Sequence, residues 1–159
     1  MKQISIELEN RPNQLTRVLG LLAARDVELR ALTVGHTISK TDKGLVKMIV
    51  NKLDTAVAAL EESGVEPMVE EVLVTPVEDH AGGLHAILEV LARANLNIEH
   101  MYTFVSRVEG KALSVFTFDD ALRAAKVLRS AGVRLIGTDS PDKLEEYALG
   151  DLWDLDVAW

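Results

Sequence analysis

The chain has 159 residues, 48% of them hydrophobic, and a formal net charge of −8. It contains no cysteine, which excludes a disulfide framework, thiolate chemistry and cysteine metal sites. No apolar run approaches the roughly 18 residues that a membrane helix needs, and the N-terminus lacks the apolar core of a signal peptide. We therefore expect a soluble cytoplasmic protein.

The first half of the chain predicts the element order β-α-β-β-α-β. Residues 3–8 alternate between polar and apolar side chains, a pattern typical of a half-buried strand. Apolar residues at helical spacing then predict a helix over residues 13–25, and Asp54 is expected to cap a second helix that ends at Gly64. The remaining strands are expected over residues 27–37, 46–50 and 66–69.

The second half repeats the first, at an offset of sixty-nine residues that becomes sixty-eight after a one-residue deletion. The matched apolar pairs include Leu15 with Leu84, Leu22 with Leu91, Val50 with Phe118 and Leu60 with Leu128. Its strands are expected over residues 72–77, 97–105, 111–118 and 133–136, and its helices over 84–94 and 120–131. We therefore expect an α+β fold of two tandem ferredoxin-like β-α-β-β-α-β units, each with an antiparallel sheet and both helices on one face.

This repeat predicts two domains, residues 1–70 and 71–138, followed by a tail over residues 139–159. The tail holds seven acidic residues and one lysine, so the repeats are nearly neutral and offer no basic patch. That distribution argues against binding to nucleic acid or to an anionic membrane surface. A serine followed by proline predicts a short helix at the start of the tail, and Trp153 and Trp159 predict that the tail docks on the protein or on a partner.

The loop before the first helix of each repeat is the candidate ligand site. A helix N-terminus has unpaired backbone N–H groups and a partial positive charge that can hold a carboxylate. In the second repeat, Gly82 and Gly83 would let a ligand approach the backbone, and Asp79 could accept hydrogen bonds from an ammonium group. The first repeat has the neutral Asn10 and the bulkier Asn13 instead. The alternative is that both loops are turns with helix caps, supplied in the first repeat by Asn10 or Asn13.

We predict no catalytic residue, metal site or cofactor. No serine lies in a G-x-S-x-G motif, and no phosphate-binding or dinucleotide-binding glycine pattern is present. His80 and His85 lack the spacing that places two metal ligands on one helical face, and His80 is expected to lie at the surface or to touch a ligand. Phe116 and Phe118 match inward-facing apolar positions of the first repeat, so core packing is preferred over an RNA-binding aromatic sheet.

The same loops carry the local mark of the ACT domain, which is an acidic or amide residue, then proline and glycine, then an apolar helix. The mark reads Asn10-Arg11-Pro12-Asn13-Gln14-Leu15 in one repeat and Asp79-His80-Ala81-Gly82-Gly83-Leu84 in the other. Each copy departs once from the Pro-Gly pair, with Asn13 for glycine and Ala81 for proline. A later apolar pair, I-x-x-L in the family, is matched by Leu29 with Leu32 and by Ile98 with Met101. Residues 1–138 therefore resemble two tandem ACT domains.

The resemblance implies a ligand, commonly an amino acid, between this loop and a strand of a neighbouring ACT unit. Residues 33–35 and 102–104 are the strand positions that could face it. The implied ligand contacts are Asn10, Pro12, Asn13, Gln14, Leu15, Asp79, His80, Ala81, Gly82, Gly83, Leu84 and Tyr102. ACT units commonly associate, so a homodimer is expected.

The chain is similar to stand-alone tandem ACT proteins, which implies a non-enzymatic regulatory protein that binds a free amino acid. The alternative is a structural or adaptor subunit that binds a metabolic enzyme without a ligand. The departures at Asn13 and Ala81 keep that alternative open.

Overall fold

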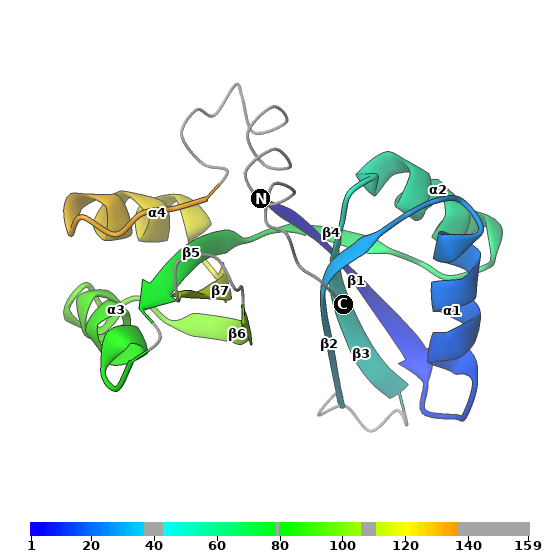
Figure 1. Cartoon of the computed structure of the whole chain (residues 1–159), viewed down its shortest axis with the longest axis horizontal. Helices are drawn as coiled ribbons and strands as arrows, with labels where there is room; N and C mark the ends of the chain where they lie inside the picture. The colour runs from blue at the N-terminus through cyan, green and yellow to red at the C-terminus, as the bar shows by residue number, and fades with distance from the viewer. Residues whose placement is uncertain (37–42, 79, 106–110, 137–159) are drawn as a thin grey trace. The chain divides into compact units, whose positions relative to one another are not determined.

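A computed structural model describes residues 1–36, 43–78, 80–105 and 111–136, which form two compact units (Figure 1). One unit is Lys2–Glu70, called here the first repeat. The other contains Met1 and the described residues from Glu71 onward, called here the second repeat. The acidic tail and the short helix predicted at its start lie outside the described residues.

The first repeat has the predicted element order. Its elements are β1 (Lys2–Glu9), α1 (Gln14–Ala23), β2 (Leu29–His36), β3 (Lys43–Val50), α2 (Leu53–Glu62) and β4 (Met68–Glu71). The strands form one sheet in the order β2-β3-β1-β4, with β3 antiparallel to both β1 and β2. This is the ferredoxin-like arrangement that two β-α-β units produce, and it confirms the predicted fold class.

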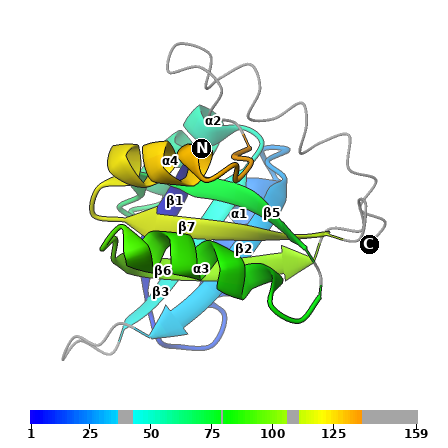
Figure 2. The ribbon, with the colours of Figure 1, turned by 90° about the vertical axis from the view of Figure 1, so that its left-hand side faces the viewer.

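The second repeat has the same plan up to its last strand. Its elements are β5 (Leu73–Glu78), α3 (Gly83–Arg93), β6 (Ile98–Val105), β7 (Lys111–Phe118) and α4 (Ala121–Ser130). The sheet order is β5-β7-β6, and Figure 2 shows α3 and α4 together on one face of it. Within the described residues, the strand predicted over 133–136 is reduced to a single bridge between Val74 and Ile136, and the Thr75 hydroxyl donates to the Arg134 carbonyl at 2.7 Å.

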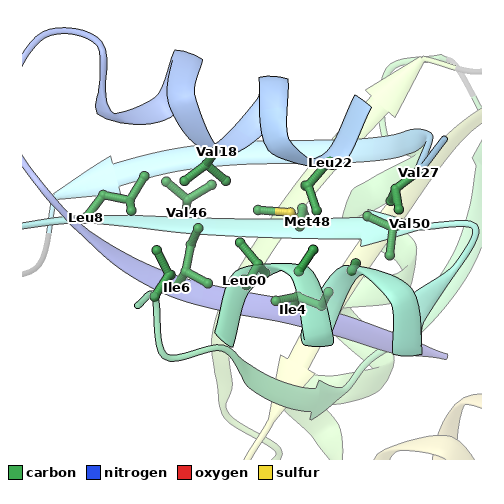
Figure 3. Close-up of a cluster of buried hydrophobic side chains, with 13 residues drawn as sticks. Ile4, Ile6, Leu8, Val18, Leu22, Val27, Val46, Met48, Val50 and Leu60 are labelled. Atoms are coloured by element: carbon green, nitrogen blue, oxygen red, sulfur yellow. The ribbon is translucent and has the colours of Figure 1, made fainter. Parts of the chain in front are cut away.

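Each repeat has its own hydrophobic core between its sheet and its helices. In the first repeat, the sheet contributes residues from alternate positions of β1 and β3, and the helices contribute the facing residues (Figure 3). This core includes Ile4, Ile6, Val46, Met48, Val50, Val18, Leu22 and Leu60. In the second repeat Phe116 and Phe118 lie in the core, as predicted, with their rings stacked.

Three local predictions have different outcomes. Gly64 ends α2 in the left-handed region with φ 79°, as predicted. Asp54 does not cap this helix, because Lys52 holds the cap position and Asp54 lies in the first turn. The polar residues Gln3 and Ser5 were expected on the exposed side of a half-buried strand, but their exposed fractions are only 0% and 2%.

Gln3 and Ser5 are satisfied by one carboxylate on β4. Glu70 Oε2 accepts hydrogen bonds from the Gln3 amide at 2.9 Å, the Ser5 hydroxyl at 3.0 Å and the Lys47 ammonium at 3.0 Å. We call these four residues the Glu70 cluster. Burial favours the neutral acid, but the hydrogen bonds and the charge of Lys47 together hold the pKa of Glu70 below its ordinary value of 4.5.

The Glu70 cluster predicts a loss of stability in acid. A carboxylate whose pKa is lowered by folding stabilises the folded state above its unfolded pKa, and that stabilisation disappears as the pH falls through the folded pKa. The free energy of unfolding should therefore decline below about pH 4.5. Urea unfolding between about pH 3 and pH 6 measures this slope, and Glu70→Gln should flatten it. An equally steep slope in Glu70→Gln would assign it to other acids.

No helix in the part of the chain that the structure describes is long and apolar enough to cross a membrane.

Candidate functional site

The candidate loops of the two repeats have the same backbone conformation immediately before their helices. Asn13, at the cap position of α1, has φ 70°, and Gly82, at the cap position of α3, has φ 96°. Both values lie in the left-handed region, which glycine enters freely and which asparagine tolerates best among the larger residues. The departure from the family pattern at Asn13 therefore preserves the shape of the loop.

The two loops also share their hydrogen bonds. Each loop has three backbone bonds at matching positions. In the first repeat these run from Arg11 N to Glu9 O (2.7 Å), from Gln14 N to Arg11 O (3.5 Å) and from Arg17 N to Asn13 O (3.0 Å). In the second they run from His80 N to Glu78 O (2.9 Å), from Gly83 N to His80 O (3.1 Å) and from Ala86 N to Gly82 O (3.0 Å). The turn is thus one structure built twice.

As far as the described residues show, both loops leave backbone donors open at the start of a helix. Among the described residues, nothing accepts a hydrogen bond from the N–H groups of Leu15 and Thr16, or from those of Leu84 and His85. The Asn13 side chain makes no capping bond, so the capping role considered for it is wrong. Two adjacent open N–H groups at the positive end of a helix dipole can hold a carboxylate.

The loops differ at the first residue of the helix. A Cβ atom on Gly83 would lie 2.2 Å from the Glu78 carbonyl oxygen, which is far inside van der Waals contact. The first repeat has Gln14 at this position, and its hydrogen bond to Arg11 is longer than the matching bond from Gly83 to His80. Gly83 therefore allows a tighter turn. The space above Gly82 is open with respect to the described residues, because a Cβ atom added there would have none of their atoms within 4 Å apart from its chain neighbours.

Most of the predicted contacts are accessible. Asn10, Pro12, Asn13, His80, Ala81 and Gly82 are exposed, and Gln14, Leu15, Gly83 and Leu84 are half-buried. Leu15 and Leu84 pack against the cores of their repeats and so fix the first helical turns. The ring of His80 is exposed, with its Nδ1 3.0 Å from the Ala81 carbonyl oxygen. Asp79 lies outside the described residues.

The structure does not bring Tyr102 to the loop of its own repeat. Tyr102 pairs with Val115 across β6 and β7, and Val115 alternates with the core residue Phe116. Tyr102 therefore lies on the sheet face away from α3, where its ring is tilted against His100 at a centroid distance of 5.9 Å. Thr33 occupies the matching position on β2, paired with Lys47.

A pair of hydroxyl groups on the helix side of the second sheet was not predicted from the sequence. Thr103 Oγ1 and Ser114 Oγ lie 2.8 Å apart, with Ser114 fully buried and Thr103 exposed on the outer strand β6. The first repeat has Val34 and Val46 at the matching positions, so a residue-by-residue comparison of the repeats could have found the change. Elsewhere in the described chain, no group of three or more histidine or acidic side chains is placed to hold a metal ion.

Comparisons with known proteins give the family and the fold of the chain. The family model for the ACT domain pair matches residues 1–146. Protein BT0572 from Bacteroides thetaiotaomicron is similar in structure, with a TM-score of 0.77 and 29% identity over 85% of this chain and 90% of that one. The regulatory subunits of aspartate kinase from Thermus thermophilus and Thermus flavus share the fold, with TM-scores of 0.57 and 0.59 and identities of 18% and 17%. They match over 82% of this chain and 91% and 92% of their own.

No curated protein matches the chain significantly in sequence. The family model nevertheless spans nearly all of it and includes both loops described above. The chain therefore belongs to the family of ACT domain pairs.

Proposed function

We propose that this protein is a non-enzymatic regulator that binds a free amino acid at the loop–helix junctions of its ACT repeats. The observation that carries the proposal is the recurrence of one turn, with a left-handed residue and two open N–H groups, in both repeats of an ACT pair. The fold shared with two regulatory subunits of aspartate kinase supports a regulatory role.

A zwitterion fits the chemistry of the second loop. Its carboxylate would accept hydrogen bonds from the N–H groups of Leu84 and His85, in the field of the α3 dipole. Asp79, placed in this loop by the sequence, would accept from the ammonium group. The open space above Gly82 leaves room for the ligand to approach the backbone. In the first loop Leu15 and Thr16 supply the N–H groups, but Asn10 carries no charge.

We expect at least one of the twenty amino acids to raise the thermal stability of the protein. At about 100 times its Kd, a ligand that binds only the folded state adds roughly 2.7 kcal/mol to the free energy of unfolding. A thermal-shift screen identifies the ligand, and isothermal titration calorimetry then measures its Kd. If no amino acid shifts the transition, ligand binding of this class is wrong.

Two substitutions, one in each loop, test which loop holds the ligand while keeping the backbone conformation of the loop. Gly82→Asn keeps a residue that tolerates φ 96° but fills the open space, so it should weaken binding if the ligand lies in the second loop. Gly82→Val would be strained at this φ and would not separate binding from folding. The matched variant Asn13→Gly removes a side chain from the first loop, so it should not weaken binding of a ligand in either loop. Unchanged affinity in Gly82→Asn would place the ligand elsewhere.

A second candidate function is that of an adaptor for a metabolic enzyme, with no ligand bound. It is favoured by Leu32 and Val34, which are 40% and 55% exposed on the outer strand β2. Apolar side chains on an uncovered sheet edge fit a protein partner such as an enzyme, and a second copy of the chain in a homodimer would compete for the same edge. A screen in which no amino acid binds would favour this candidate.

A further inference from the structure

An open groove runs between α3 and α4 of the second repeat. Its volume is about 500 Å³. It is lined by Val90, Arg93, Ala94, Lys126, Val127, Ser130 and Ala131. The floor is thus largely apolar, and the charged side chains are Lys126 and Arg93, which also forms an ion pair with Glu89 at 3.3 Å. This groove is independent of the loops proposed to bind an amino acid.

The first repeat has an ion pair across the two equivalent helices. There, Arg25 after α1 reaches Glu62 of α2, with 2.5 Å between guanidinium and carboxylate. The matching positions of the second repeat are Ala94 and Ser130, which are too short to bridge the two helices. The second repeat therefore lacks the side-chain bridge that joins the two helices of the first repeat.

The helix beside the groove is basic. The charged residues of α4 are Arg123, Lys126 and Arg129, with no acidic residue among them. The matching helix α2 carries Asp54, Glu61 and Glu62 and no basic residue. Arg123 also donates to the Ala94 carbonyl at 2.7 Å, which holds its positive charge at the groove. An occupant should therefore combine apolar side chains with negative charge.

The tail of the same chain has this composition. Residues 139–159 contain seven acidic residues and one lysine, and they include both tryptophans of the chain, Trp153 and Trp159. The tail begins eight residues after Ala131, which lines the groove, and the described chain between them passes Val74 of β5. At about 3.3 Å per extended residue it is long enough to reach every part of the groove. Burial of a tryptophan there would remove on the order of 200 Å² of apolar surface from water.

We propose that the acidic tail, residues 139–159, docks into the groove between α3 and α4 of its own chain through a tryptophan, with its carboxylates beside Arg93, Arg123 and Lys126. The proposal goes beyond ligand binding and does not depend on it. It assigns an intramolecular partner to the basic helix α4.

Contact quenching of a bimane label by tryptophan tests this in the full-length chain. The chain has no cysteine, so Ser130→Cys creates a single labelling site at the groove. The matched control is Glu62→Cys, the equivalent position of the first repeat. Both tryptophans belong to the tail, so only the tail can quench either label by this mechanism. We expect the label at position 130 to lose most of its emission and the label at position 62 to keep it.

Further variants test whether the tail tryptophans and the basic side chains cause the quenching, and whether the quenching tail belongs to the same chain. Trp153→Phe with Trp159→Phe, or Arg93→Glu with Lys126→Glu, should restore the emission at position 130. No quenching at position 130, or equal quenching at both positions, would overturn the proposal. Labelled Ser130→Cys chains that lack both tryptophans are then mixed with unlabelled wild type. Quenching in this mixture would show that the groove takes the tail of a second copy, which would overturn docking within one chain.

Discussion

Glu70→Ala is expected to lower the free energy of unfolding by about 3 kcal/mol, because it leaves three buried donors without their acceptor. Gln3 and Ser5 are almost fully buried, and the Lys47 side chain is only 9% exposed. All three donate to the same oxygen of Glu70. Glu70 itself is 26% exposed, so the effect should fall at the lower end of the range for broken buried pairs. Urea unfolding followed by circular dichroism measures it.

Two controls test whether the loss of stability in Glu70→Ala comes from the Glu70 cluster itself. Glu71→Ala removes the same charge from the same strand at an exposed position and should change stability by less than about 0.5 kcal/mol. The second repeat shows how the cluster can be replaced, because Val72, Val74 and Val115 occupy the positions of Gln3, Ser5 and Lys47. Changing Gln3, Ser5 and Lys47 to valine together with Glu70→Val should therefore restore most of the stability lost in Glu70→Ala. Equal losses in Glu70→Ala and Glu71→Ala would refute this role for the cluster.

Gly83→Ala is expected to cost about 3 kcal/mol, the upper end for an overpacked site, because backbone cannot move away from the added methyl group easily. The new Cβ would lie 2.2 Å from the Glu78 carbonyl oxygen and 3.1 Å from its carbon. Relief requires the end of β5 or the start of α3 to shift, which would also disturb the hydrogen bond from Gly83 to His80. Denaturant unfolding and amide exchange at the start of α3 measure the change.

Gly20→Ala is the matched control, because the same substitution there should have the opposite sign. Gly20 lies inside α1, and nothing lies within 4 Å of an added Cβ. Alanine in an open helical position should stabilise the protein by about 0.5–1 kcal/mol. If Gly83→Ala were as harmless as this control, the close approach to Glu78 would not constrain the loop.

The cores and the order of the elements could be predicted from the sequence because they depend on local periodicity. Strand alternation in residues 3–8 and helical spacing from Leu15 to Leu22 are visible within a few residues. The repeat then provides a second copy of each signal, which is why Phe116 and Phe118 could be placed in the core. The same recurrence singled out the two loops of the candidate site as one structure.

Side-chain partners from distant strands could not be predicted in this way. Gln3 and Ser5 have the alternation of an exposed face, and only the pairing of the strands brings them, with Lys47, to Glu70. Their burial thus follows from contacts more than sixty residues apart in sequence. Tyr102 likewise carries no mark of the sheet face on which it lies, since that depends on its register with Val115.

By itself, the sequence determined that this protein is built from two ACT-like repeats with a turn before the first helix of each, because periodicity, turn residues and repetition are local. The tertiary structure decided the roles of the two glycines. Gly82 provides a positive φ that asparagine also tolerates, whereas Gly83 is needed because the Glu78 carbonyl approaches it. It also decided that Asn13 preserves the turn and that the space between α3 and α4 is open, because both depend on atoms brought together only by folding.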